Sequence, residues 1–334
     1  MTQSNAVALK QGDVPEPRLC DSGMQLIRGT HNLHHAQFGC VATIGNFDGV
    51  HLGHRKILAR VREQARDLGV VSTVMLFEPQ PQEFFVPDQA PARLMSLRDK
   101  LRTLAALGVD QVFCARFDDS FRSQSADAFV RDLLVDGLGV RHLVVGDDFR
   151  FGSGREGDFA YLCDAGRRFD FSVEDTPTCE LQGARVSSTR VREALATGNV
   201  ALTEQLLGRP YVISGRVHQG DRIGRTIGVP TANLPLRRLR VPISGVFAVT
   251  VNGAGLKDAP AVANMGHRPT VDGVGWRLEV HLLDYTGDLY GRHLEVALRH
   301  YIRPEQKFDG LEALRSAIHN DIDNARLWFA ETGL

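Results

Sequence analysis

Two histidines close a glycine-rich segment near the start of the chain, residues 45–54, which reads GNFDGVHLGH. We call this segment the histidine loop. His51 and His54 are three residues apart, so both imidazoles would share one face of a first helical turn. Gly49 and Gly53 let the backbone approach a ligand closely. Three roles fit this pattern: phosphate binding at a helix N-terminus, metal binding with a third ligand, and a plain turn.

A second segment, VSSTRVREAL (186–195), has the composition of a helix start that could bind an anion. Ser188 or Thr189 can cap the helix, and Arg190 and Arg192 supply fixed positive charges. An ordinary capped helix explains the same letters. The segment therefore indicates chemistry only together with the histidine loop.

The second half of the chain holds two further polar patterns. In GDRIGRTIGVPTANLPL (220–236), Thr231 and Asn233 alternate on an extended segment, so they point the same way. Their oxygen atoms suit Mg²⁺, and the segment lacks G-K-[ST], so it is not a Walker A loop. In WRLEVHLLDYTGDLYG (276–291), Glu279 is either a solvent-facing charge or a carboxylate that faces a site.

Short apolar runs alternate with helical periodicity between Cys40 and Leu207, and they predict the elements that carry the first two motifs. Strand–helix–strand repetition predicts a doubly wound, mostly parallel α/β sheet of Rossmann-like type. The histidine loop would follow one strand and begin its helix, at the edge where such sheets bind ligands. Strands are expected at 40–45, 70–77, 110–117 and 141–146, and helices after 54, over 97–108 and over 125–139.

After Gly208 the runs become short, β-rich and separated by glycine turns, which predicts an antiparallel β-barrel. A closing amphipathic helix is expected over 310–330. Its apolar side would comprise Leu311, Leu314, Ile318, Ile322 and Leu327. The expected organisation is a flexible extension over 1–23, an α/β domain over 24–207 and a barrel domain over 208–334.

Composition narrows the class of protein. The chain has 334 residues, enough for two cores, and its net charge of −1 argues against a nucleic-acid-coating protein. Five cysteines without a C-x-x-C pair favour free thiols in the reducing cytoplasm. No secretory signal and no membrane-spanning run is expected. The predicted partners are small molecules, with no nucleic acid and no membrane, and the sequence leaves the oligomeric state open.

The motifs together resemble those of the bacterial bifunctional riboflavin kinase / FAD synthetase family. GNFDGVHLGH is similar to a nucleotidyltransferase signature with an H-x-G-H core, and VSSTRVREAL is similar to the S-S-T-x-x-R element that accompanies it. The P-T-A-N segment resembles the riboflavin kinase signature. The resemblance runs from about Met24 to the C-terminus. It implies phosphorylation of riboflavin to FMN with Mg-ATP, then adenylylation of FMN by ATP to FAD and pyrophosphate.

The resemblance also implies roles for residues. His51 and His54 would act in adenylyl transfer, Glu279 would be the general base of the kinase, and Thr231 and Asn233 would hold Mg²⁺. Phosphate or nucleotide binding would fall to Gly45, Asn46, Asp48, Gly53, Ser187, Ser188, Thr189, Arg190, Arg192, Gly224 and Arg225. Pro79, Asp148 and Phe149 would contact the flavin. Gln80 stands where the family commonly has histidine, and Val229 where it commonly has an aromatic residue.

Three other readings are open to test. GSGREG (152–157), followed by Glu174 and Asp175, fits the dinucleotide fingerprint of an oxidoreductase. The fit is poor because the expected strand ends at Gly146, whereas the fingerprint needs its glycines at the turn itself. A flavin-binding module without turnover would keep the pockets but need no paired histidines. A nucleotidyltransferase for another acceptor would not need the kinase-like half.

Overall fold

The computed structural model describes residues 23–33, 39–146, 148–219, 228–236, 240–270 and 273–334, with the side chains of 267–274 outside that description. These residues form two compact units, each built from several segments of the chain. The first unit takes in 1–45, 60–79 and 105–175, and the second 46–59, 80–104 and 176–334. Residues 46–54 of the histidine loop therefore belong to the second unit, together with all of 186–195.

The first unit is built on a six-stranded sheet in the order β1-β4-β3-β2-β5-β6. The pairs β1–β4, β4–β3, β3–β2 and β2–β5 are parallel. From β2 the chain proceeds outward to β3 and β4 on one side and to β5 and β6 on the other, which is the doubly wound topology that the sequence predicted. The strands are β1 (Gln25–Arg28), β2 (Cys40–Ile44), β3 (Val71–Glu78), β4 (Gln111–Arg116), β5 (Val140–Gly146) and β6 (Ser172–Thr176).

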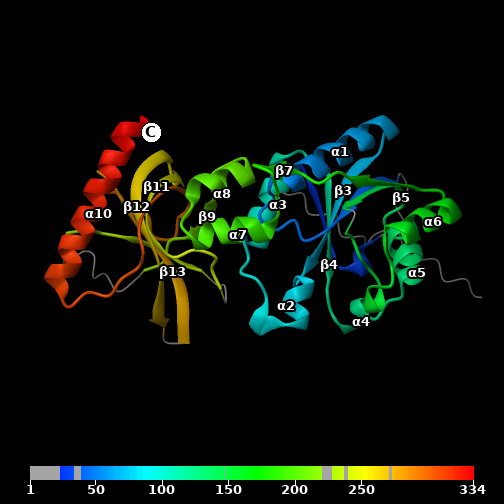
Figure 1. Ribbon diagram of the computed structural model, residues 1–334, viewed down its shortest axis with the longest axis horizontal. Coiled ribbons are helices and arrows are strands. Elements are labelled where there is room, and N and C mark those ends of the chain that lie inside the picture. Colours follow the sequence, from blue (N-terminus) through cyan, green and yellow to red (C-terminus); the bar gives the residue numbers. More distant parts are fainter. Residues whose placement is uncertain (1–22, 34–38, 147, 220–227, 237–239, 271–272) are drawn as a thin grey trace, which may run out of the picture. The chain divides into compact units, whose positions relative to one another are not determined.

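Apolar helices cover this sheet, and α5 and α6 lie together beside it (Figure 1). Helix α5 (Ala126–Ala128) continues as a π-helical segment, Phe129–Val135, and α6 spans Phe159–Phe169. Their apolar residues share one core with β2, β3, β4 and β5. The short helix α4 (Asp119–Arg122) precedes them. Helix α1 (Leu52–Leu68) follows the histidine loop, begins in the second unit and ends in the first.

The segment GSGREG does not form a dinucleotide-binding turn. Phe151 pairs with Gly157 across a short 3₁₀ turn at Ser153–Arg155, well after the end of β5. Glu174, the acidic residue of that fingerprint, instead pairs with Arg60 at 2.7 and 2.9 Å. The oxidoreductase reading therefore loses both of its structural requirements.

The second unit contains the predicted antiparallel barrel. Its sheet has the order β10-β13-β12-β11-β14-β9, and the two edge strands β9 and β10 also contact each other, so the barrel is nearly closed. Alternate side chains of each strand fill its interior, as Leu278 and Val280 do on β13. The strands are β9 (Val212–Arg216), β10 (Ala232–Leu236), β11 (Gly245–Gly253), β12 (Leu256–Thr270), β13 (Gly273–Leu282) and β14 (His293–Arg303).

Helices of the same unit pack against the barrel. The barrel core continues into α7 (Ser188–Ala196) and α8 (Val200–Leu207), which lie side by side (Figure 1). Three further elements lie outside the barrel sheet: α2 (Pro81–Phe85), α3 (Leu97–Ala106) and the hairpin of β7 (Glu180–Leu181) and β8 (Ala184–Arg185). Short 3₁₀ turns occur at Thr30–Asn32 and Pro87–Gln89.

The closing helix α10 (Leu311–Thr332) lies along β11, β12 and β14, but its predicted apolar side was partly wrong. Leu311 and Leu327 are 61% and 62% exposed. The buried side instead contains Ala325 and Phe329, which are four residues apart and so share a face that Leu327 does not. Leu314, Ile318 and Ile322 are partly buried, as predicted.

Candidate active site

The histidine loop has an unusual backbone. Phe47, Gly49 and Val50 have φ angles of 45°, 83° and 45°, in the left-handed region that favours glycine. At Gly49 a Cβ atom would also lie 2.7 Å from Leu94 Cδ1. Glycine is therefore required at this position by both conformation and space. Such strained segments persist only where neighbouring groups fix them, and they concentrate at functional sites.

A buried carboxylate holds the loop in place. Asp48 is 2% exposed, and its oxygens accept hydrogen bonds from the backbone N–H groups of Leu94 (3.0 Å) and Met95 (3.3 Å). The Arg192 guanidinium donates to the same carboxylate at 2.6 Å and to the Ala92 carbonyl at 2.6 Å. Asp48 and Arg192, both predicted to bind phosphate, thus bind each other and join three segments of the chain.

The two histidines stack face to face directly after this bend. Their ring centroids are 3.7 Å apart with 15° between the planes, and the Phe47 ring packs against His54 at 4.8 Å. The backbone N–H of His54 donates to His51 Nδ1 at 3.3 Å, which caps the first turn of α1. A neutral His51 ring then carries its hydrogen on Nε2 and can donate from that atom.

Burial keeps both rings neutral. It lowers the pKa of His51 to about 4, with the nearby Arg185 and Arg192 acting in the same direction and Asp48 opposing them. Burial and the adjacent His51 hold the pKa of His54 well below its ordinary value. His54 Nδ1 is buried and has no hydrogen-bond partner among the described residues. The pair can therefore serve as neutral hydrogen-bond donors at pH 7, whereas free histidine is partly charged.

The second motif meets the histidine loop. Ser187, rather than the predicted Ser188 or Thr189, caps α7 by accepting from Arg190 N at 3.2 Å, and Ser188 Oγ donates to the Asp48 carbonyl at 2.9 Å. A Cβ at Gly53 would lie 3.5 Å from the carbonyl that precedes Ser187. Thr189, in the first turn of this helix, is exposed. The starts of α1 and α7 thus come together, and each offers free N–H groups to an anion.

Arg190, predicted to supply a fixed positive charge, is held by hydrogen bonds to the backbone. Its Nη1 donates to the carbonyls of Leu181 and Ala184 at 2.8 and 2.9 Å, so it braces the β7–β8 hairpin. Asn46, also predicted to bind nucleotide, has a buried amide oxygen with no partner among the described residues. The Asn46 oxygen is therefore a buried acceptor that a ligand could satisfy.

Four predicted residues lie in the first unit. Gly45 donates its N–H to the Met75 carbonyl at 3.1 Å, and Pro79 directly follows β3. Asp148 is exposed in the turn after β5, and Phe149 stacks on Phe151 with centroids 5.7 Å apart. Their contact with a flavin stays a prediction.

Gln80, which departs from the family pattern, lies at the start of α2. Its backbone N–H donates to the Glu83 carboxylate at 2.9 Å, and Glu83 pairs in turn with Arg93. The Gln80 side chain is buried, and its amide nitrogen has no partner among the described residues. Glutamine therefore leaves an uncharged donor where the family commonly has a ring that can be charged.

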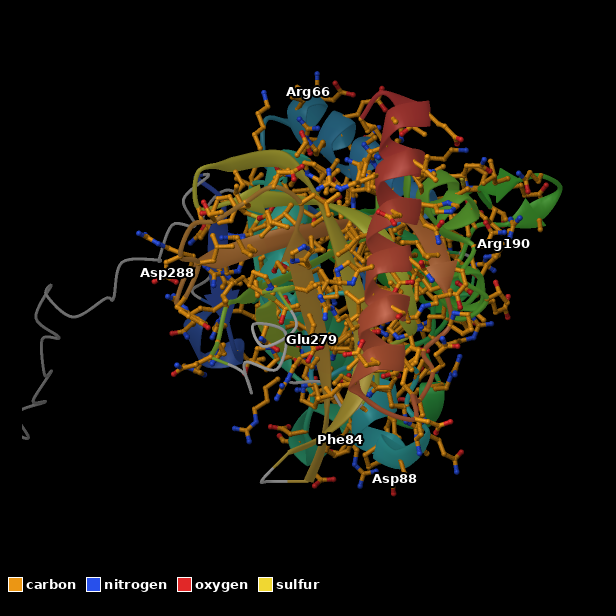
Figure 2. All side chains as sticks on the ribbon, turned by 90° about the vertical axis from the view of Figure 1, so that its left-hand side faces the viewer. Arg66, Phe84, Asp88, Arg190, Glu279 and Asp288 are labelled. Atoms are coloured by element: carbon orange, nitrogen blue, oxygen red, sulfur yellow. The ribbon has the colours of Figure 1, made fainter. Side chains whose placement is uncertain are left out.

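The second candidate site lies on the barrel. Glu279 faces away from the interior, because its neighbours Leu278 and Val280 point inward. Asn233 on β10 and Asn264 on β12 stand directly opposite Glu279 in the two flanking strands, so the three side chains share one face. Arg277 Nη1 lies 3.9 Å from the Glu279 carboxylate. In Figure 2 the labelled Glu279 and Arg190 lie well apart, so this site is distinct from the one at the start of α7.

Asn233 and Thr231 can supply oxygen ligands to a cation. Asn233 is 8% exposed, and its amide nitrogen donates to the Thr231 carbonyl at 3.3 Å. This bond uses the nitrogen, and the remaining amide oxygen is the atom that suits Mg²⁺. Gly224 and Arg225 fall outside the described residues. Among those residues there is no cluster of three or more His, Cys, Asp or Glu side chains able to hold a metal.

Sequence reasoning missed three residues of these sites. Lys100 is 2% exposed and donates to the Asn46 carbonyl at 2.6 Å. Lys100 directly precedes Leu101 and lies one helical turn before Leu104, so it falls on the apolar side of α3. This placement was a visible signal, because an unpaired lysine is rarely buried. Arg209 and Asn264 gave no such signal, since their positions depend on contacts between distant segments.

The chain combines two different folds and two candidate sites, which defines a nucleotide-dependent transferase with a second site on the barrel. Comparison with known proteins agrees with this arrangement. The family model described as FAD synthetase matches residues 33–190, and that described as riboflavin kinase matches 207–329. The bifunctional riboflavin kinase/FMN adenylyltransferase of Escherichia coli K12 is 56% identical over 92% of this chain and 99% of its own. That of Pseudomonas fluorescens is 56% identical over 91% and 97%. The chain belongs to the bifunctional riboflavin kinase/FMN adenylyltransferase family.

A solved structure supports the fold over nearly the whole chain. It is described as a macrolide-efflux protein from Streptococcus pneumoniae, has 29% sequence identity and a TM-score of 0.76, and covers 91% of this chain and 99% of its own. In the part of this chain that the structure describes, no helix is both long enough and apolar enough to span a membrane.

Proposed function

We propose that this chain converts riboflavin to FMN and FMN to FAD, using ATP in both steps. The observation that carries the proposal is the presence, on one chain of this family, of two separate sites with different chemistry. One is a stacked pair of neutral histidines at the meeting helix starts of α1 and α7. The other is a carboxylate between two amides on the barrel.

In the first step, the riboflavin 5′-hydroxyl attacks the γ-phosphorus of ATP and ADP leaves. Glu279 takes the hydroxyl proton, and Asn233 and Asn264 stand opposite it in the two flanking strands. Thr231 and Asn233 would hold Mg²⁺, which neutralises phosphate charge when bound. Binding of Mg²⁺ is supported by the oxygen donors at these two positions.

In the second step, a phosphate oxygen of FMN attacks the α-phosphorus of a second ATP and pyrophosphate leaves. His51 donates from Nε2 to the charge that develops on the phosphoryl oxygens, and the helix N-termini of α1 and α7 add their N–H groups. The chain forms no covalent intermediate; positioning and charge stabilisation carry the step. The predicted cytoplasmic location is part of the same proposal, supported by the free cysteines at 40, 114, 163 and 179.

The test is to incubate the protein with riboflavin, ATP and Mg²⁺ and to separate the flavins by chromatography over time. FMN should appear first and FAD should follow, with ADP equal to the sum of FMN and FAD, and pyrophosphate equal to FAD. Formation of FMN without FAD would support the kinase activity and contradict the adenylyltransferase activity. Binding of flavin without either product would favour the non-catalytic module, and adenylylation of a different acceptor alone would favour the third reading.

Replacing His51 or His54 with alanine tests the assignment of the two sites. Loss of one donor to developing phosphoryl charge typically costs on the order of 10² to 10³ in rate. We therefore expect FAD formation from supplied FMN to fall by about that factor, while FMN formation from riboflavin continues. Equal loss of both activities in a folded variant would contradict two separate sites.

A further inference from the structure

Four successive carbonyl groups of the histidine loop, at residues 46–49, each accept a hydrogen bond. One bond is internal, from Val50 N to the Phe47 carbonyl at 3.3 Å. Side chains of three distant segments make the other bonds: Lys100 Nζ to Asn46 O at 2.6 Å, Ser188 Oγ to Asp48 O at 2.9 Å, and Arg209 Nη2 to Gly49 O at 2.8 Å.

The loop needs such support because of its conformation. Phe47 and Val50 adopt positive φ angles without being glycine, and Val50 is β-branched, which makes that conformation especially unfavourable. His51 follows Val50 directly. Any relaxation of Gly49 and Val50 would therefore turn the His51 ring away from its present stacking on His54.

Arg209 is the supporting residue that comes from the kinase half. It lies between α8 and β9, inside the riboflavin kinase match, whereas the histidine loop lies inside the FAD synthetase match. The contact is reciprocal: Arg55 Nη1, one residue after His54, donates to the Gly208 carbonyl at 3.1 Å. All of these residues belong to the same compact unit.

A second bond from this segment reaches the loop through one intermediate. The Tyr211 hydroxyl is buried and donates to the Leu94 carbonyl at 2.8 Å. The backbone N–H of Leu94 donates in turn to the Asp48 carboxylate at 3.0 Å. The start of the barrel therefore fixes both the Gly49 carbonyl and the segment that binds Asp48.

We propose that Arg209 is a positioning residue for FMN adenylylation: the kinase half supplies the guanidinium that fixes the backbone of the loop carrying His51. This inference rests on the proposed role of His51 in that reaction. The adenylylation site is then incomplete without the first residues of the kinase half, although Arg209 itself contacts neither substrate.

The experiment compares Arg209→Met, Arg209→Lys and the parent as full-length proteins, with supplied FMN and ATP. A hydrogen bond from a charged donor is worth enough that its loss should lower kcat for FAD formation on the order of 10- to 100-fold, with little change in the KM for ATP. Arg209→Lys, which keeps one charged donor, should recover most of the rate. Riboflavin phosphorylation in the same samples should stay at the parent level.

Two controls separate positioning from a general loss of structure. Arg102→Met removes another arginine of the same unit, which is exposed and pairs with Glu295 of β14 at 3.1 Å but touches no residue of the loop. It should leave both activities unchanged. In an NMR titration, the pKa of His51 should rise from about 4 toward 6.5 in Arg209→Met, because a loosened loop admits water to the ring. The pKa should remain at the parent value in Arg102→Met.

The outcomes distinguish this inference from the proposed function. If His51→Ala leaves FAD formation intact, the proposed site itself is wrong. If His51→Ala abolishes FAD formation but a folded Arg209→Met keeps the parent kcat and the parent His51 pKa, the inference is overturned. If Arg209→Met does not fold, Arg209→Ala, which also removes every side-chain donor, takes its place, and an unchanged kcat in that folded variant overturns the inference equally.

Discussion

At the scale of single residues, the two candidate sites depend on opposite electrostatic environments. His51 and His54 are kept neutral by burial and by positive neighbours. Glu279 is partly exposed, opposite Asn233 and Asn264 and 3.9 Å from the Arg277 guanidinium. The proposed roles differ accordingly: a neutral donor for adenylyl transfer and a proton acceptor for hydroxyl activation.

Replacement of Glu279 with Gln tests the proton acceptor. The change keeps the shape and an acceptor oxygen but removes the basic one, and a positioned base typically contributes ~10² to 10⁴-fold. FMN formation should fall by that order while riboflavin binding and adenylylation of supplied FMN stay near normal. Glu331→Gln, at an exposed position in the last turn of α10, serves as a control that removes a carboxylate elsewhere in the same unit. Kinase activity within a few-fold of the parent would place the base elsewhere.

The pKa of His51 predicts how stability depends on pH. In the unfolded chain this histidine binds a proton below pH ~6.5, whereas in the folded protein it does so only near pH 4. Between these values the unfolded state holds more protons, so stability must fall as the pH drops through this window. At the acid end of this pH window, the loss of folding stability that is due to His51 reaches ~3 kcal/mol.

Urea unfolding from pH 7.5 to 4.5 measures this effect. His51→Gln has no titrating ring, so its unfolding free energy should decline less steeply than that of the parent over the same range. Parallel curves for the two proteins would show that burial does not shift the pKa of His51.

At the scale of elements, the turn between β2 and α1 sets the position of the histidines. Gly49→Ala should destabilise the protein strongly for two reasons. Alanine would have to adopt the positive φ of 83°, and its Cβ would lie 2.7 Å from Leu94 Cδ1. Gly183, between β7 and β8, has a similar φ of 72° but nothing within 4 Å of an added Cβ. The two substitutions therefore share the backbone cost and differ only in packing.

We expect Gly49→Ala to lower the free energy of unfolding by ~2–3 kcal/mol and to reduce FAD formation at least about tenfold. Gly183→Ala should cost only ~1 kcal/mol and leave both activities near normal. Urea unfolding and the two half-reaction assays provide the measurements. Equal effects of the two alanines would mean that the loop has room to repack around Leu94.

At the scale of the whole molecule, the barrel shares its core with helices that precede it. Leu206 and Leu207 of α8 are fully buried in the same apolar cluster as Ile213 and Leu298 of the barrel. A Cβ at Gly198 would lie 2.9 Å from the Tyr301 ring, so the segment before α8 also packs tightly on β14. Leu206 and the segment at Gly198, which lie outside the riboflavin kinase match at 207–329, therefore help to complete the barrel.

This shared core predicts how fragments behave. A fragment beginning at Ser187 keeps α7 and α8 on the barrel, whereas one beginning at Arg209 loses them. Burial of a leucine side chain contributes ~1.5–3 kcal/mol, so the shorter fragment should be less stable by at least ~3 kcal/mol. Both should phosphorylate riboflavin where they are folded. Equal unfolding midpoints for the two fragments would show that α8 adds nothing to the barrel.

The sequence by itself determined the elements and the motifs that carry the candidate reacting groups. Alternating and helical apolar patterns predicted the parallel sheet, the barrel and the closing helix, because those periods follow from strand and helix geometry. The motifs around His51, Ser187 and Glu279 predicted where chemistry would lie. These are local properties, and residues close in sequence are enough to express them.

The tertiary structure alone decided which charged side chains bind other parts of the protein. Arg192 carries a visible charge, but its partner Asp48 lies 144 residues away, and Arg209 lies 160 residues from Gly49. The exposure of Leu327 on α10 depended likewise on which side of the helix met the barrel. Rules based on sequence spacing cannot predict such pairings. They arise only when the folded chain brings distant segments into contact and buries one side of each.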